Sequence, residues 1–113
     1  MILRGYFRSS TTYRVRIALN LKGLDYAQEP VDLLARANHT SEFRAINSFG
    51  SVPSLTIAGE HYAQSLAIIE LLAERWPEPA FLPASSCGRI KAREWAFAIA
   101  TELHAPLNLP VLN

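Results

Sequence analysis

The sequence predicts an α/β domain built on a mixed four-stranded sheet, followed by a separate helical segment. Near the start, two short apolar runs flank an amphipathic stretch, which is the pattern of a β–α–β unit with parallel strands. A proline-led hairpin and a second amphipathic stretch come next. A connector with several prolines then separates these elements from the last apolar stretch, so we expect two structural units.

The first unit begins with a strand over residues 2–6, and a helix then starts at the polar cluster of residues 9–12. The apolar residues of this helix recur at helical spacing: Val15, Ala18, Leu19 and Leu21. Lys22 and Gly23 fit the helix end, because a cation favours the carboxyl end and glycine adopts the left-handed conformation of a C-cap. A second strand over residues 26–31 completes the β–α–β unit.

Pro53 opens the second half of the domain. Because proline donates no ladder hydrogen bond, we place it at the very start of a strand that contains residues 55–57. Residues 58–60 are the expected hairpin turn, and Ser65 is the expected N-cap of the following helix. The apolar positions of that helix are Leu66, Ile69 and Leu72. Before the hairpin, residues 41–46 have the pattern of a short helix.

The proline-rich connector defines the domain boundary. We expect a first domain over residues 1–76, a linker over residues 77–87, and a helix with a broad apolar face over residues 88–113. A single helix of this kind does not cover its own apolar face. Its stripe, from Ile90 through Trp95 and Phe97 to Leu103, therefore needs a partner.

Composition and charge exclude several functional classes. The 113 residues fit one domain with an ordinary globular balance of 50% hydrophobic and 19% charged residues. A net charge of +1, with basic residues dispersed, argues against nucleic acid or a membrane surface as partner. The sequence after Met1 has the pattern of neither a signal peptide nor a transmembrane helix. The single Cys87 forms no internal disulfide, which fits a reducing compartment, so we expect a cytoplasmic protein.

Two sets of motifs give the chain a family resemblance. Residues 7–19 resemble the signature of the zeta class of glutathione transferases, the maleylacetoacetate and maleylpyruvate isomerases. Val52-Pro53 and Gln64-Ser65 resemble the second half of the glutathione-binding domain that the whole superfamily shares. The resemblance spans essentially the whole chain. It implies a thioredoxin-like fold for residues 1–76, with residues 88–113 as the first helix of an all-α domain that is truncated here.

The resemblance also implies an activity. Glutathione would act as cosubstrate or catalyst without a metal, its thiolate adding to a small electrophile and, in the isomerases, leaving after rotation about a cis double bond. It further implies a homodimer. A non-catalytic glutathione-binding or interaction module, the remnant of a longer enzyme, is the alternative. Because no cysteine lies in the turn before the first helix, dithiol exchange is not expected, and Cys87 is expected to be a bystander.

Ser9, Ser10 and Thr11 are the catalytic candidates. A thiol with a pKa of about 8.5 is mostly protonated at neutral pH, and a hydroxyl at the positive end of a helix dipole stabilises its thiolate. The resemblance gives the thiol contact to Ser9 and places Thr11 where the family often has cysteine. Taken alone, the three residues are more typical of helix caps and a solvated turn.

The glutathione-binding candidates besides Ser9 come from three places in the chain. The resemblance makes Pro53 a cis proline and pairs the N–H and C=O of Val52 with the cysteinyl part of glutathione, whereas an arbitrary X-Pro bond is usually trans. Gln64 and Ser65 would hold the γ-glutamyl carboxylate at a helix N-terminus, or form an ordinary cap. The candidates for the glycyl end are Asn38 and His39.

The substrate-pocket candidates are Arg8, His104 and Asn108. Residues 104–112 resemble a zeta stretch that lines the substrate pocket, with Pro110 in place of an arginine expected near the substrate carboxylates. Arg8 is a second candidate for that contact, because guanidinium groups suit carboxylates. A lone histidine near a helix is otherwise more often structural or solvated.

Overall fold

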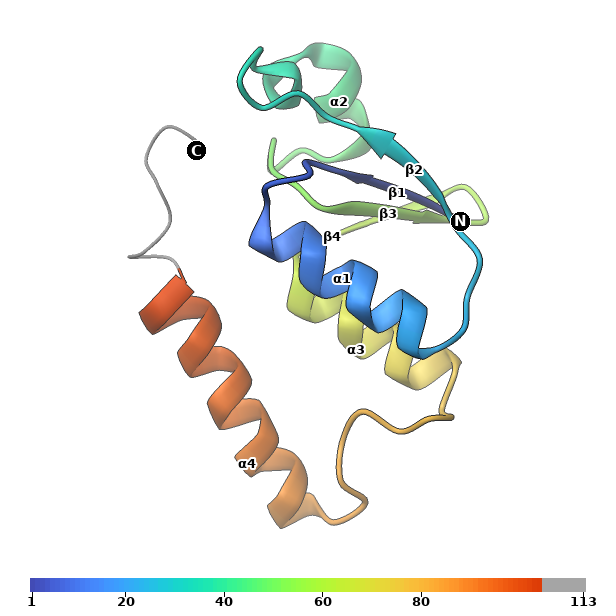
Figure 1. Cartoon of the computed structure of the whole chain (residues 1–113), viewed down its shortest axis with the longest axis vertical. Helices are drawn as coiled ribbons and strands as arrows, with labels where there is room; N and C mark the ends of the chain where they lie inside the picture. Colours follow the sequence, from blue (N-terminus) through green and yellow to red (C-terminus); the bar gives the residue numbers. More distant parts are fainter. Residues whose placement is uncertain (105–113) are drawn as a thin grey trace.

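A four-stranded mixed sheet forms the centre of the fold in the computed structural model, which describes residues 1–104 (Figure 1). The strands are β1 (Ile2–Gly5), β2 (Ala27–Pro30), β3 (Ser54–Ile57) and β4 (Glu60–Ala63). Their order is β2-β1-β3-β4, with β1 parallel to β2 and antiparallel to β3, and β3 antiparallel to β4. The predicted mixed sheet is confirmed.

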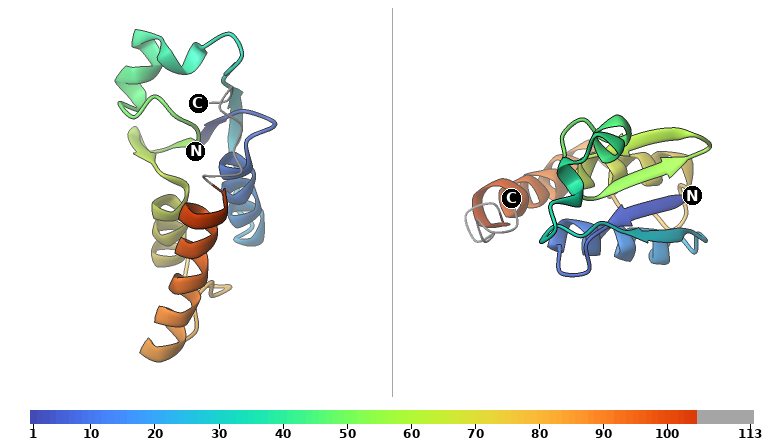
Figure 2. Two further views of the ribbon diagram at one scale, coloured as in Figure 1. Left: turned by 90° about the vertical axis from the view of Figure 1, so that its left-hand side faces the viewer. Right: turned by 90° about the horizontal axis from the view of Figure 1, so that it is seen from above.

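The helices lie on both sides of this sheet and beyond it. They are α1 (Ser10–Leu21), α2 (Ser41–Ile46), α3 (Ser65–Arg75) and α4 (Ser86–Phe97), with a 3-10 turn at Ala37–His39 and a π-helical turn at Ala98–His104. α1 and α3 run side by side along one face of the sheet, while α2 lies near its opposite side (Figures 1 and 2). The short helix expected over residues 41–46 is confirmed.

The core lies between the sheet and the helices α1 and α3. Its fully buried side chains come from both strands and helices: Leu3, Val15, Leu19, Leu55, Ile68 and Leu72. The sequence prediction for α1 holds for three of its four apolar positions, since Leu21 is exposed. In α3 the core positions are Ile68 and Leu72, whereas Leu66 and Ile69 are only partly buried. Because α3 is apolar on most sides, its periodicity does not single out the buried face.

Three predicted boundaries shift by one or two residues. Gln64, with a φ of 71°, is the residue that caps α3, so Ser65 is the first helical residue and not the N-cap. The hairpin turn is formed by Ala58 and Gly59, which both have positive φ, and Glu60 already belongs to β4. α4 begins at Ser86, ahead of the expected residue 88, because the Ser85 hydroxyl accepts the Gly88 N–H at 3.0 Å.

Lys22 joins the end of α1 to the connector. Gly23 has a φ of 68°, as expected for the left-handed residue after a helix. The buried Lys22 ammonium donates to the Pro79 carbonyl and lies 4.1 Å from the centroid of the Phe81 ring. This cation therefore stabilises the carboxyl end of α1 and holds the connector against the first domain at the same time.

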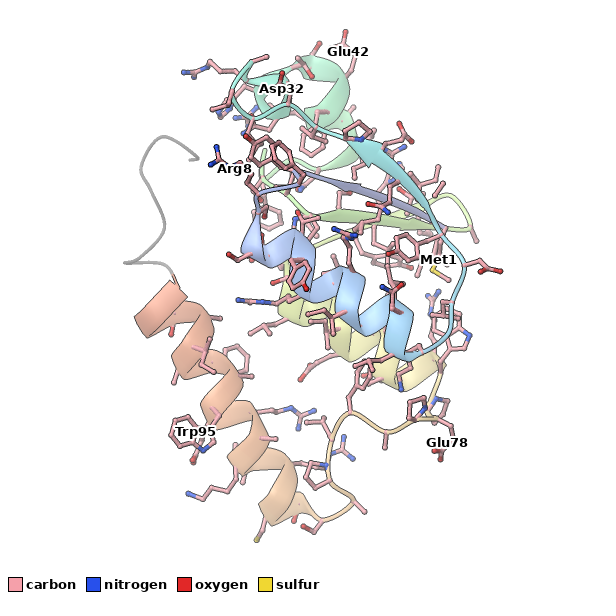
Figure 3. All side chains as sticks on the ribbon, viewed as in Figure 1. Met1, Arg8, Asp32, Glu42, Glu78 and Trp95 are labelled. Atoms are coloured by element: carbon pink, nitrogen blue, oxygen red, sulfur yellow. The ribbon has the colours of Figure 1, made fainter. Side chains whose placement is uncertain are left out.

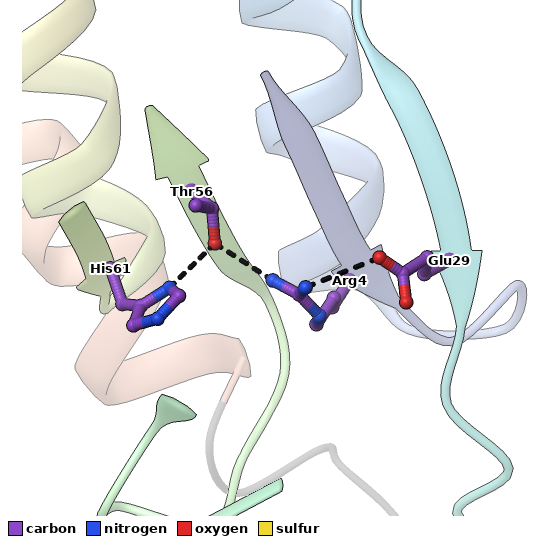
Figure 4. Close-up of polar contacts among 4 residues, drawn as sticks. All are labelled: Arg4, Glu29, Thr56 and His61. Carbon is purple, nitrogen blue, oxygen red and sulfur yellow. Dashed lines mark hydrogen bonds and ion pairs between the residues drawn. The ribbon is translucent and has the colours of Figure 1, made fainter. Parts of the chain in front are cut away.

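A row of polar side chains crosses all four strands on the sheet face away from α1 (Figure 4). Arg4 contacts Glu29 at 3.2 Å and donates to the Thr56 hydroxyl at 2.7 Å. That hydroxyl lies 2.7 Å from His61 Nδ1. Because a guanidinium only donates, Thr56 accepts from Arg4 and has its proton free for His61, whose Nδ1 is then the acceptor. One side chain from each strand is thus tied to the next.

α4 extends away from the rest of the chain and has no buried residue (Figure 2). The described members of the expected apolar stripe, Ile90, Trp95 and Phe97, are all more than half exposed. They do not form one face, because Figure 3 shows Trp95 pointing away from α3, whereas Phe97 lines a groove shared with α3. An ion pair between Arg93 and Glu70 at 2.8 Å joins α4 to α3. Neither α4 nor any other helix within residues 1–104 is long and apolar enough to cross a membrane.

Candidate functional site

A cleft of about 390 Å³ lies where the starts of α1 and α3 face the end of α4. Thr11 and Arg14 of α1 form one wall, and Gln64 and Ser65 at the start of α3 form the floor. The remaining lining from the far side consists of Phe97, Ala100 and Thr101. Residues from three separate parts of the chain therefore enclose one space beside two helix N-termini, where free N–H groups favour anionic ligands.

The hydroxyl cluster at the start of α1 is one hydrogen-bonded unit. The Ser9 hydroxyl accepts the Thr12 N–H at 3.1 Å and lies 2.8 Å from the Thr11 hydroxyl. Thr11 donates to the Val52 carbonyl at 3.1 Å. Because Thr11 gives its single proton to Val52, the Ser9 hydroxyl donates to Thr11. Thr11 lines the cleft, Ser9 supports it as the N-cap, and Ser10 is exposed.

The Val52-Pro53 peptide bond is cis, as the resemblance implies. Val52 precedes β3, and within residues 1–104 its N–H takes part in no hydrogen bond. Its carbonyl is held by Thr11. A backbone N–H beside an already oriented carbonyl has the pattern that an extended peptide needs for strand-like pairing.

Arg14 is a site residue that the sequence analysis missed. Its Nη1 donates to the Ser65 hydroxyl at 3.2 Å, and both residues line the cleft. Burial lowers the pKa of Arg14 from its ordinary value, yet a guanidinium stays charged at neutral pH. The missed signal was spacing: Arg14 follows Thr11 by three residues, so the two share one side of a helix.

The glycyl candidates, Asn38 and His39, lie outside the lining of this cleft. Asn38 is buried, and its Nδ2 donates to the Gly50 carbonyl at 2.8 Å, so it orients the loop that leads to Pro53. His39 is exposed, with Nδ1 3.0 Å from Arg44 Nη2. In this structure Asn38 acts on the proline loop, and His39 stays accessible to a ligand.

The substrate-pocket candidates divide between described and undescribed parts of the chain. Arg8 is exposed in the loop between β1 and α1 (Figure 3). The His104 side chain, together with Asn108 and Pro110, lies outside the described residues. The far wall that the structure does describe, formed by Phe97 and Ala100, was not among the sequence candidates. The apolar pattern of a helix does not by itself show which face of that helix packs against another domain.

Comparison with known proteins assigns the family. Residues 8–75 match the family described as "Glutathione S-transferase, N-terminal domain". The chain belongs to the glutathione S-transferase family. This glutathione S-transferase chain is 49% identical over 111 residues to the maleylacetoacetate isomerase of Rhizobium meliloti (strain 1021), an alignment that covers 98% of the chain and 52% of the relative.

Two solved structures show the same fold. The maleylpyruvate isomerase, a bacterial glutathione S-transferase in the zeta class, superimposes with a TM-score of 0.93 at 39% identity, over 99% of this chain and 53% of that one. The maleylacetoacetate isomerase of Methylobacterium extorquens AM1, solved with malonate and glutathione bound, has a TM-score of 0.91 at 39% identity, over 99% and 52%. This glutathione S-transferase chain thus has the expected thioredoxin-like fold and spans about half the length of the relatives it matches.

Proposed function

We propose that this chain binds glutathione in the cleft and activates its thiol for addition to a small electrophile, as a transferase or cis–trans isomerase of the zeta type. The observation that carries the proposal is the Thr11–Val52 hydrogen bond, which joins the hydroxyl cluster to the proline loop beside Ser65. Ser65, the partner for a carboxylate, lines the cleft together with Thr11, and Thr11 contacts both Ser9, the partner for the thiol, and Val52, the partner for the cysteinyl backbone. A relative of the same fold was solved with glutathione bound, which supports the assignment.

Thiol activation follows from the start of α1. The partial positive charge of a helix N-terminus and hydroxyl donors both favour a thiolate over a thiol. In this structure the Ser9 proton is directed at Thr11, and the Ser9 hydroxyl donates to a bound thiolate by turning its proton away from Thr11. The thiolate then forms a bond to an electrophilic carbon. As it does so, the π bond at that carbon opens and its electron pair moves into the conjugated electron-withdrawing group, which leaves a single bond. In the isomerase reaction this single bond rotates, the electron pair returns to re-form the double bond, the carbon–sulfur bond breaks, and the glutathione thiolate is regenerated.

Glutathione and S-methylglutathione are both expected to bind the chain, because the groups that contact the peptide backbone and the carboxylates lie within residues 1–76. Titration calorimetry measures this directly, with thermal unfolding as a second readout. If neither heat nor a thermal shift appears at millimolar ligand, the binding proposal fails. If both ligands bind equally, the thiol contributes little to affinity, as expected for a group whose role is chemical.

The alternative function is a glutathione-binding or interaction module without catalysis. What favours it is Pro110, which stands where the resemblance expects an arginine near the substrate carboxylates. Binding of glutathione with no change in its thiol reactivity would support this alternative over the transferase or isomerase.

We also propose that the partner of α4 is a second copy of this chain. Ile90 and Trp95 are more than half exposed, and apolar surface gains about 25 cal/mol per Å² when it is buried. Most soluble oligomers are two-fold symmetric. Sedimentation at micromolar concentration is expected to show a dimer that Trp95→Glu converts to monomer, with the fold intact. A wild-type monomer contradicts this proposal.

A cytoplasmic location remains the expectation from the single, exposed Cys87.

A further inference from the structure

Arg14 is a partly buried cation without an anionic partner in the described part of the chain. The ion pairs found there involve Arg4, Lys91 and Arg93, and none involves Arg14. Among the described side chains that line the same cleft, the one acid is Glu70, which contacts Arg93 at 2.8 Å. A charge removed from water is stabilised by a counter-ion. The cleft at Arg14 is therefore suited to a negatively charged group.

The hydrogen bond between Arg14 and Ser65 determines which of the two groups donates and which accepts. A guanidinium has no acceptor, so the Ser65 oxygen accepts from Nη1 and its own hydrogen is left to donate. Ser65 is only 8% exposed and lines the cleft. As the first residue of α3, it also stands beside backbone N–H groups that have no partner inside the helix. The Ser65 hydroxyl and the first N–H groups of α3 are therefore available to donate to an acceptor on a ligand.

We infer that Arg14 is a positioning residue for the carboxylate end of the ligand. It holds the Ser65 hydroxyl as a donor and supplies the positive charge that the carboxylate requires. The inference rests on the proposed binding of glutathione and adds a residue to it. The γ-glutamyl carboxylate is the group concerned, because Gln64 and Ser65 are its proposed partners and both line the cleft with Arg14.

Replacing Arg14 with methionine tests the inference through a pair of ligands. Arg14→Met is expected to weaken glutathione binding about tenfold or more, since hydrogen bonds that involve charged groups are stronger than those between neutral groups. Cysteinylglycine lacks the γ-glutamyl residue, so its affinity is expected to stay as in the wild type. Arg14→Lys is expected to recover most of the glutathione affinity, because Ser65 receives a single N–H and an ammonium can supply it. Calorimetry at matched pH and salt provides the values.

Arg16→Met is the matched control, because Arg16 lies on the same helix but lines a different groove, beside β2. It is expected to leave glutathione affinity unchanged. If Arg14→Met weakens both ligands equally, or if Arg14→Lys fails to recover binding, Arg14 is structural and the inference is overturned. If Arg14→Met binds glutathione like the wild type, only the role of Arg14 is overturned. A wild-type chain that binds no glutathione contradicts the proposed function itself.

Discussion

Gly5→Ala is expected to destabilise the fold strongly and to disturb the cleft with it. A Cβ at Gly5 would lie 2.2 Å from Thr12 Cγ2 and 2.8 Å from its hydroxyl. Thr12 is buried in the first turn of α1, so it has little room to move. Overpacking of this kind costs about 1–3 kcal/mol, and contacts this short belong at the upper end. Because the start of α1 must shift, the hydrogen bond from Thr11 to Val52 is expected to weaken as well.

Urea unfolding measures the effect, and a second substitution provides the control. In Gly5→Ala with Thr12→Ala, the methyl and hydroxyl groups that would meet the new Cβ are gone, leaving the residue 12 Cβ at 3.1 Å. The double variant is therefore expected to be more stable than the two single losses predict, since neighbouring substitutions are not additive. Strict additivity, or a Gly5→Ala protein as stable as the wild type, would show that β1 and α1 are not packed this closely.

Ser9→Ala is expected to slow the reaction of bound glutathione with an alkylating agent about tenfold at neutral pH. The loss of a hydroxyl donor raises the pKa of the bound thiol, and a shift of one unit changes the thiolate population about tenfold below that pKa. Alkylation by iodoacetamide at saturating glutathione provides the rates. The substitution also removes the N-cap of α1, which costs about 1 kcal/mol of stability.

Ser10→Ala is the matched control for this effect. Ser10 is exposed at the same helix end and belongs to no part of the Ser9–Thr11–Val52 network. Its removal is expected to leave the alkylation rate unchanged. If Ser9→Ala reacts as fast as the wild type, the thiol contact moves to Thr11, and Thr11→Val should then show the loss.

Much of the fold follows from local patterns, and the cleft does not. The β–α–β unit and the proline-led hairpin have strong signals in residues near one another, and both are confirmed. In α3 the pattern identified the buried Leu72 but not the buried Ile68, because apolar residues occupy most sides of this helix and Ile68 and Ile69 are equivalent by pattern. The sequence motif contains Arg14 and Arg16 two residues apart, and nothing local shows that only the first reaches Ser65.

The far wall of the cleft illustrates the same limit. Phe97 and Ala100 belong to an apolar helix whose packing partner depends on the connector, including the contacts of Lys22 with Pro79 and Phe81. The cis bond at Pro53 was predicted because it belongs to the backbone of a shared fold, and the structure confirms it. Contacts between side chains of different helices or strands are predicted from a sequence only when a family motif includes the residues concerned.

The thiolate absorbance of glutathione bound to the wild-type chain, followed in the ultraviolet against pH, tests the central claim most directly. The free thiol titrates near a pKa of about 8.5. We expect a lower midpoint for the bound thiol, because the N-terminus of α1 and its hydroxyl donors stabilise the thiolate. A bound thiol that titrates at or above the midpoint of free glutathione would contradict it.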